Sequence, residues 1–125
     1  MQVACGVAVR EGKVLICKRG ASGAYPGYWE FPFVPLEDGE VLEEALERGV
    51  FERLSSKVSA AVRLFSLDSR CVEGVRIHAY GVRLSEKHLV LAGYASANWI
   101  GVNKLSRFRL LPDCVKLVNE MQKKM

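Results

Sequence analysis

The segment from Pro26 to Val58, PGYWEFPFVPLEDGEVLEEALERGVFERLSSKV, decides how the rest of the chain is interpreted. An aromatic loop with several prolines leads into an acidic stretch, and from Val41 to Leu54 apolar residues recur at steps of three and four positions. That spacing predicts an amphipathic helix of about four turns. Glutamates at its start suit the positive end of the helix dipole. A rigid helix that follows such a loop is a suitable platform for carboxylates that bind a metal.

The spacing of the polar residues in this segment resembles the motif of the Nudix hydrolases. That motif is a Gly, five residues, a Glu, seven residues, and then Arg-Glu-apolar-any-Glu-Glu-any-Gly, commonly preceded by Trp-Glu-Phe-Pro-Gly. Trp29–Pro32 matches the leading run, and Glu40 and Arg48 match the first Glu and the Arg. In the family, three helix carboxylates hold magnesium at a diphosphate. We expect Glu40 and Arg48 to form a structural pair between the loop and the helix.

The resemblance is incomplete at the metal-binding positions. The three family carboxylates correspond to Gly49, Glu52 and Arg53, so Glu52 is the one retained of three. Magnesium requires several hard oxygen ligands in near-octahedral geometry, which one carboxylate beside an arginine does not supply. The two loop glycines of the family correspond to Phe33 and Val34, which add bulk where the backbone would approach phosphate. Glu52 is therefore the single candidate for a catalytic or metal-binding role, with Mg or Mn as cofactor only if the protein is active.

Four residues before the helix are predicted to bind substrate. The resemblance places Arg19, at the end of a strand, within reach of substrate phosphates; the alternative is a solvated strand end. The leading run of the motif adds the other three, so the predicted contacts with a nucleotide or another phosphate-bearing ligand are Arg19, Trp29, Glu30 and Phe31.

Outside this segment, the pattern predicts strands and one more helix. Apolar or alternating segments bounded by turn residues predict strands, namely 2–10, 13–19, 58–67, 76–84, 88–92 and 94–100. Apolar spacing predicts a helix from Cys114 to Lys124 with Asp113 as its cap. Trp99-Ile100 and Leu110–Pro112 also match the end of Nudix chains. The resemblance implies an α/β Nudix fold, a mixed, curved β-sheet sandwiched between helices, in a single Nudix-like domain of residues 1–125.

Composition narrows the class further. Half of the residues are apolar, without a run long enough to span a membrane and without a signal peptide, so we expect a cytoplasmic protein with no membrane partner. The four cysteines lack metal-ligand spacing and are expected to be buried free thiols. The two histidines are expected to have structural or surface roles. The net charge of +4 indicates either a solvated basic surface or a phosphate-bearing partner.

Three functions follow from these observations. The first is a nucleotide- or phosphate-binding protein on a Nudix scaffold, catalytically impaired or inactive. The second is an active, magnesium-dependent pyrophosphohydrolase that uses Glu52 and Glu40, with Glu37 or Glu44 as further ligands. The third is an interaction protein that binds RNA through its basic surface, although no aromatic-basic RNA motif is visible.

Overall fold

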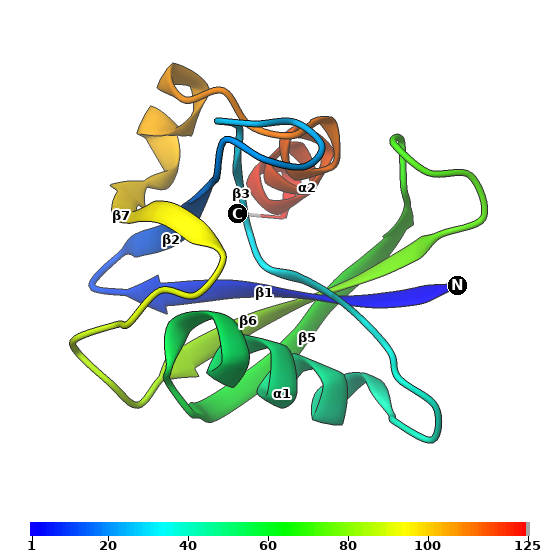
Figure 1. Cartoon of the computed structure of the whole chain (residues 1–125). Coiled ribbons are helices and arrows are strands. Elements are labelled where there is room, and N and C mark those ends of the chain that lie inside the picture. The colour runs from blue at the N-terminus through cyan, green and yellow to red at the C-terminus, as the bar shows by residue number, and fades with distance from the viewer. Residues whose placement is uncertain (125) are drawn as a thin grey trace.

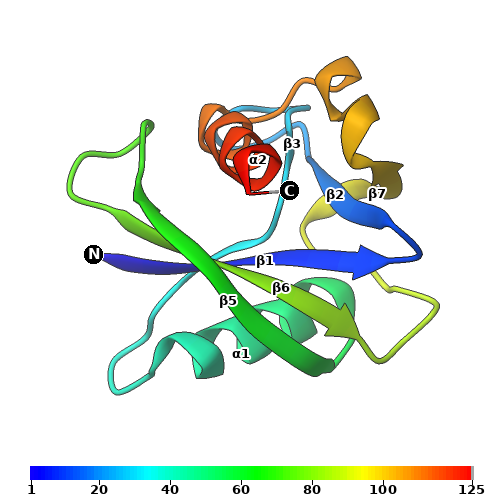
Figure 2. The same ribbon diagram turned by 180° about the vertical axis from the view of Figure 1, so that it is seen from behind.

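The computed structural model describes residues 1–124 and consists of a mixed β-sheet with a helix on either side (Figure 1). In Figures 1 and 2, α1 and α2 lie on opposite sides of the central strand β1. The predicted architecture, a mixed sheet between helices, is confirmed. The elements are β1 (Gln2–Arg10), β2 (Lys13–Arg19), β3 (Trp29–Glu30), β4 (Phe33–Pro35), α1 (Leu42–Leu54), β5 (Val58–Asp68), β6 (Arg76–Leu84), β7 (Tyr94–Gly101), the 3-10 helix η1 (Val102–Arg107) and α2 (Pro112–Lys123).

The sheet divides where β2 leaves β1. These two strands pair only at the hairpin end, where Val9 faces Val14 and Arg10 faces Lys13. Beyond that point β1 pairs with β4 and, in parallel, with β6, while β2 pairs with β3 and β7. β5 follows β6 at the outer edge of the sheet. β1 and β2 therefore diverge beyond the hairpin and belong to different parts of the sheet.

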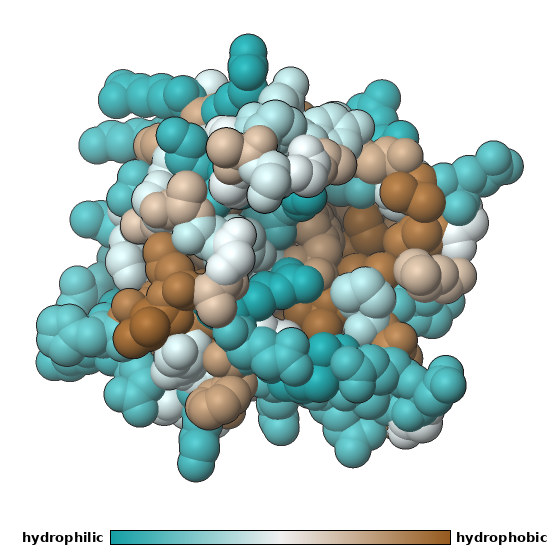
Figure 3. Space-filling model, in the orientation of Figure 1, coloured by the Kyte–Doolittle hydropathy of each residue, from teal (hydrophilic) through white to brown (hydrophobic). Residues whose placement is uncertain are grey.

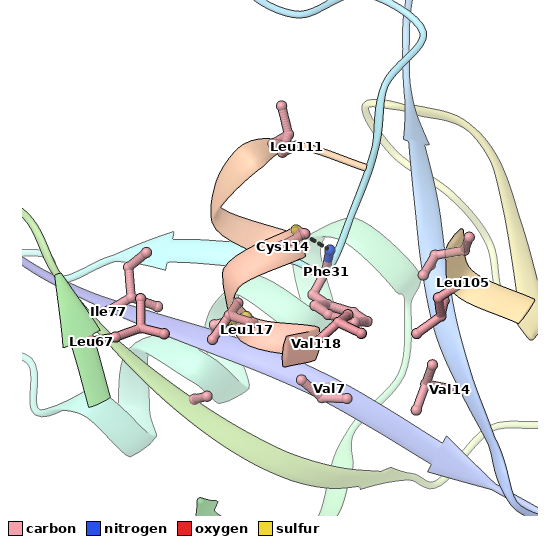
Figure 4. Packing of buried hydrophobic residues seen from close by; sticks show 13 residues of the cluster. Val7, Val14, Phe31, Leu67, Ile77, Leu105, Leu111, Cys114, Leu117 and Val118 are labelled. Atoms are coloured by element: carbon pink, nitrogen blue, oxygen red, sulfur yellow. Dashed lines mark hydrogen bonds between the residues drawn. The ribbon is translucent and has the colours of Figure 1, made fainter. Parts of the chain in front are cut away.

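The apolar residues form one buried cluster under each helix. Figure 4 shows the cluster beneath α2, in which Phe31 and Val7 lie between the helix and the strands. The second cluster lies between the sheet and α1 and includes Leu46, Val50 and Leu54. Strand β1 contributes to both clusters because successive side chains point to opposite faces, which explains why almost every one of its positions is apolar.

The α1 helix confirms the predicted amphipathic pattern and starts one residue later than expected. Glu44 accepts a hydrogen bond from the backbone N–H of Val41 at 3.0 Å, which satisfies one of the free donors at the start of the helix. At the other end Ser55 adopts a left-handed conformation with φ of 55°, and its N–H bonds to the carbonyl of Phe51. That conformation ends the helix before β5.

Two predictions about secondary structure are wrong. Residues 88–92 form no strand, because the N–H groups of Val90 and Ala92 bond to the carbonyls of Leu54 and Arg53 at the end of α1. This segment satisfies free helix carbonyls and does not extend the sheet. Asp113 does not cap α2, which begins at Pro112. Its carboxylate instead accepts bonds from the Ser69 hydroxyl (2.7 Å) and the Arg70 N–H (2.6 Å), and so ties α2 to the β5–β6 connection.

The cysteines and histidines have mostly structural surroundings. Three of the predicted buried thiols are buried, and Cys71, between β5 and β6, is exposed; all four are free. His78 is buried, and its ring contacts the side chains of Ser66, Arg63 and Gln2. His88 is exposed. Within residues 1–124, neither helix has the length and apolarity needed to cross a membrane.

Candidate functional site

A cavity of about 230 Å³ lies at the C-terminal end of α1, where this helix meets β2, β3 and β7. Figure 3 shows this face of the molecule, with a hollow between the polar surface of α1 and the segments above it. The cavity combines charged side chains with small residues of the β2–β3 and β6–β7 connections. Its lining is Arg19, Gly20, Ser22, Glu30, Phe33, Arg53, Ala92, Gly93 and Tyr94.

A buried carboxylate is at the centre of the hydrogen bonds in this cavity. Glu30 is 3% exposed. Its Oε1 accepts a bond from the Arg19 guanidinium at 2.5 Å, and its Oε2 accepts one from the Tyr94 hydroxyl at 2.8 Å. Burial, together with the negative charge of Glu30, raises the pKa of Tyr94, so this hydroxyl stays protonated and remains a donor. Both oxygens of Glu30 are therefore engaged by protein groups.

Arg53 supplies a second guanidinium group to the cavity. It lies in the last turn of α1 and donates to the Tyr94 hydroxyl at 3.4 Å. Within residues 1–124, no carboxylate lies within 4 Å of it, whereas Arg19 is paired with Glu30. The cavity thus has two guanidinium groups and one carboxylate in its lining. It has an excess of one positive charge, and Arg53 carries it.

The contact between β4 and α1 depends on Gly49. A Cβ atom placed on Gly49 would lie 2.3 Å and 2.6 Å from the two methyl groups of Val34, and 3.0 Å from the Val34 Cβ. Val34 is 1% exposed, so its side chain occupies the space that a side chain at position 49 would need. The sequence analysis expected Val34 to add bulk at this loop, and its side chain packs on α1 at Gly49. No side chain on the helix can therefore occupy the space between Gly49 and β4.

The predicted pair of Glu40 and Arg48 forms, and it belongs to a larger group of charges. The Arg48 guanidinium bonds to both oxygens of Glu40, at 2.8 Å and 3.0 Å, and to the Pro35 carbonyl at 3.0 Å. Glu37 and Glu52 lie within 3.3 Å and 3.6 Å of the same guanidinium. The bonds from Arg48 lower the pKa of Glu40, and those to Glu40 raise the pKa of Arg48.

Glu52, the predicted catalytic and metal-binding residue, lies outside the cavity. Its side chain is 58% exposed and its carboxylate faces Arg48 on the outer surface of α1. The neighbouring Arg53 lines the cavity instead. Successive residues on a helix point about 100° apart, so these two neighbours face different directions.

The structure brings two of the four predicted substrate-binding residues into the cavity. Arg19 and Glu30 line it, in contact with each other. The Trp29 ring packs edge-on against Phe108, with 5.4 Å between ring centres. Phe31 is fully buried beneath α2, where its N–H donates to the Cys114 sulfur at 3.4 Å (Figure 4). A side chain in that position is not open to a ligand in the cavity.

Tyr94 and Ser22 are cavity residues that the sequence alone did not point to. Tyr94 comes at the start of a strand, directly after Gly93, and nothing in its local pattern indicates that it bonds to Glu30, 64 positions earlier. Ser22 lies in the Gly- and Ala-rich connection between β2 and β3. Serine is common in turns because its hydroxyl can bond to the nearby backbone, so its presence there does not indicate a binding site.

The donor set of the cavity does not suit a divalent cation. Within residues 1–124 no group of three or more His, Cys, Asp or Glu side chains is arranged to hold a metal ion. The single carboxylate of the cavity has both oxygens in hydrogen bonds, and two guanidinium groups lie beside it. Magnesium and manganese prefer several carboxylate or carbonyl oxygens.

The fold is that of the Nudix proteins. The chain matches a solved MutT structure with a TM-score of 0.82 and 18% identity, over 100% of each chain. That structure comes from a study of MutT from Aliivibrio salmonicida and Vibrio cholerae. It matches the NUDIX domain of Shewanella oneidensis NrtR, complexed with ADP ribose, with a TM-score of 0.79 and 18% identity, over 99% of this chain and 87% of that one.

Sequence comparison identifies relatives that are named as nucleotide hydrolases. No protein-family model matches the chain. It is 25% identical to the CTP pyrophosphohydrolase of Escherichia coli K12 over 120 residues, 94% of this chain and 88% of that protein. It is 33% identical to the nucleoside triphosphatase NudI of Enterobacter sp. strain 638 over 57 residues, 45% of this chain and only 40% of that protein. The chain therefore has the Nudix fold and is similar in sequence to these nucleotide hydrolases, in line with the resemblance seen in the sequence.

Proposed function

We propose that this Nudix-fold protein binds a nucleotide or another phosphate-bearing ligand in the cavity at the end of α1 and is catalytically impaired or inactive. The observation that carries the proposal is Arg53, a guanidinium group in the cavity with no carboxylate partner within residues 1–124. A guanidinium group binds phosphate oxygens through two parallel N–H bonds and remains charged at any physiological pH.

The class of ligand is supported by the relatives. Two of them are named for action on CTP and on nucleoside triphosphates, and the NrtR domain is complexed with ADP ribose. The cavity of about 230 Å³ is smaller than the range of about 300–1,000 Å³ of pockets that enclose a whole ligand. It suits the phosphate portion of a nucleotide, with the nucleoside outside it.

The impairment of hydrolysis is supported by the positions of the charged groups. In the Nudix motif a divalent metal held by helix carboxylates orients the diphosphate and activates water. Here the motif is degenerate: Gly49 packs on Val34, Arg53 faces the cavity, and Glu52 faces Arg48. Arg19 and Arg53 would hold the ligand, and Glu30 would orient Arg19. Glu52, the one retained carboxylate of the three in the motif, would be the candidate acid for catalysis. Mg or Mn would be required only if hydrolysis takes place.

Further features of the protein belong to the same proposal. The chain would act as a single Nudix-like domain in the cytoplasm, and its net charge of +4 would favour phosphate-bearing ligands generally. The sequence contains no recognisable aromatic-basic RNA-binding motif, so we rank a small phosphate compound above RNA as the ligand.

Calorimetry with the full chain tests the binding. AMP, ADP, ATP, CTP and ADP-ribose would be titrated in the presence of EDTA into the wild type, Arg53→Gln and Arg83→Gln. Arg83 is an exposed arginine of β6 outside the cavity, so its variant controls for the loss of one positive charge. Charge-assisted hydrogen bonds contribute about 1.5–3 kcal/mol, so Arg53→Gln should weaken binding at least about tenfold and Arg83→Gln should not. Equal loss in both variants, or no binding of any compound, would contradict the proposal.

A hydrolysis assay tests the impairment separately. The same compounds would be incubated with Mg²⁺ or Mn²⁺ and the products separated by chromatography. We expect either no turnover or turnover more than about a hundredfold slower than that of ordinary enzymes. Turnover within about a hundredfold of ordinary enzymes that Glu52→Gln abolishes would show instead that the protein is an active pyrophosphohydrolase.

A further inference from the structure

The positions of Arg53 and Glu30 bear on which form of a phosphate ligand the cavity accepts. Glu30 already has a charge partner: its Oε1 accepts from the Arg19 guanidinium at 2.5 Å and its Oε2 accepts from the Tyr94 hydroxyl at 2.8 Å. Removing one partner of such a buried pair is strongly destabilising. Among residues 1–124, Glu30 is the one carboxylate that lines the cavity, and because Arg19 neutralises its charge, it attracts a divalent cation weakly.

Arg53 has donors to spare for a ligand. A guanidinium group has five N–H donors, and the side chain of Arg53 makes a single hydrogen bond within residues 1–124, to the Tyr94 hydroxyl at 3.4 Å. That hydroxyl donates its own proton to Glu30, so Tyr94 stands between Arg53 and the carboxylate. The arrangement leaves the positive charge of Arg53 available to an anion that enters the cavity.

The packing of Gly49 prevents the usual alternative, a carboxylate one turn earlier on the same helix. Any Cβ at that position would lie 2.3 Å from a methyl group of buried Val34. The helix therefore presents a cation at position 53 and has no room for an acid at position 49. The cation at position 53 and the lack of room for an acid at position 49 both disfavour the binding of a metal ion by this helix.

We infer that the cavity selects a phosphomonoester free of divalent cation, with Arg53 neutralising the phosphate charge, and that Mg²⁺ competes with the protein for polyphosphate ligands. This inference rests on the proposed function and narrows its ligand class. A phosphomonoester has a charge of about −1.5 to −2 near neutral pH and three terminal oxygens, which suit a guanidinium fork. A hydrated magnesium–triphosphate complex brings its own dication and its water shell to a cavity of about 230 Å³ that already has an excess positive charge.

The chemistry of the ligand also suggests its source. Cleavage of a nucleoside triphosphate between its α and β phosphates yields a nucleoside monophosphate, which is a phosphomonoester. A reaction of that class, catalysed by another protein, would supply a ligand that this cavity accepts. A sugar phosphate has the same terminal group, and the experiment distinguishes the two.

The test is calorimetry with four probes, AMP, ribose 5-phosphate, ADP-ribose and ATP, first with EDTA and then with excess Mg²⁺. ADP-ribose contains a diphosphate but no terminal monoester. We expect AMP to bind at least about tenfold more tightly than ADP-ribose. Excess Mg²⁺ should weaken ATP binding at least about tenfold and change AMP binding little. Similar affinities for AMP and ribose 5-phosphate would assign recognition to the phosphate alone, and tighter AMP binding would add the nucleoside; both support the inference.

The opposite outcomes separate the two proposals. If Mg²⁺ tightens binding of ATP, or if ADP-ribose binds as well as AMP, the inference is overturned while phosphate binding in the cavity stands. If none of the probes binds under either condition, both are overturned. Arg53→Lys retains the charge but lacks the planar fork, so it should lose AMP affinity while the exposed control Arg83→Lys does not. An unchanged affinity of Arg53→Lys would show that the fork plays no part.

Discussion

The packing of Gly49 against Val34 gives the most direct stability prediction. Gly49 lies inside α1, and an alanine there would ordinarily stabilise a helix by about 1 kcal/mol. Here the added Cβ would lie 2.3 Å and 2.6 Å from the methyl groups of Val34, whereas carbon atoms in contact are normally about 3.5–4.0 Å apart. We therefore expect Gly49→Ala to destabilise the protein.

The magnitude follows from two opposing effects. Overpacking a buried site costs about 1–3 kcal/mol. The upper end applies because the contact involves the whole branched side chain of buried Val34, whose rotamer is restricted. After the gain in helix propensity of about 1 kcal/mol, the net loss is about 2 kcal/mol. For a chain of this length it lowers Tm by about 6–10 °C, between the values for smaller and larger domains.

The assay is urea unfolding followed by circular dichroism, with the loss read as a lower midpoint at constant slope. Gly20→Ala is the matched control, because Gly20 has open space around the position of a Cβ and is not in the left-handed region. That control should be neutral or slightly stabilising, through the restricted unfolded chain. If Gly49→Ala were as stable as Gly20→Ala, the close packing would be refuted.

A double mutant cycle identifies the contact itself. Val34→Ala removes both methyl groups that meet the added Cβ, and alone it should cost about 2 kcal/mol through lost burial. In Val34→Ala/Gly49→Ala the clash of about 3 kcal/mol is relieved while the gain in helix propensity remains, so the double variant should be more stable than the sum of the single effects by about 3 kcal/mol. Additive losses would show that Val34 is not the obstacle. The same contact predicts that a carboxylate at position 49 needs a smaller residue at position 34.

Two further predictions concern other hydrogen bonds. Tyr94→Phe removes the hydroxyl that donates to Glu30 and that lies between Glu30 and Arg53. The variant should be less stable by about 2 kcal/mol and should bind AMP more weakly in calorimetry, because Arg53 becomes free to pair with Glu30. An unchanged AMP affinity would contradict this role of Tyr94. Arg48 lowers the pKa of Glu40 in the folded state, so the stabilisation is present above the ordinary pKa of about 4.5 and is lost as pH falls through the lower folded value. Urea midpoints measured from neutral to acidic pH should therefore converge for wild type and Glu40→Gln, and a constant difference would show that the pairing has no such role.

The sequence by itself determined the local features of this protein. The helix over residues 42–54 follows from apolar spacing of three and four positions, and the β1–β2 hairpin from two apolar runs around a Gly-containing turn. The Glu40–Arg48 pair follows from a fixed spacing within one loop and helix. The missing carboxylates of the motif are likewise visible in the sequence, because each is defined by its place relative to Arg48.

The tertiary structure decided what depends on segments far apart in the chain. Phe31 is a core residue because α2 covers it. Asp113 does not cap α2, because its carboxylate accepts hydrogen bonds from Ser69 and Arg70 in the β5–β6 connection. Val34 fills the space above Gly49 only because β4 crosses α1 there. The reason is physical: a local pattern fixes which backbone bonds a segment makes, while burial and side-chain partners depend on which distant element occupies the adjacent space.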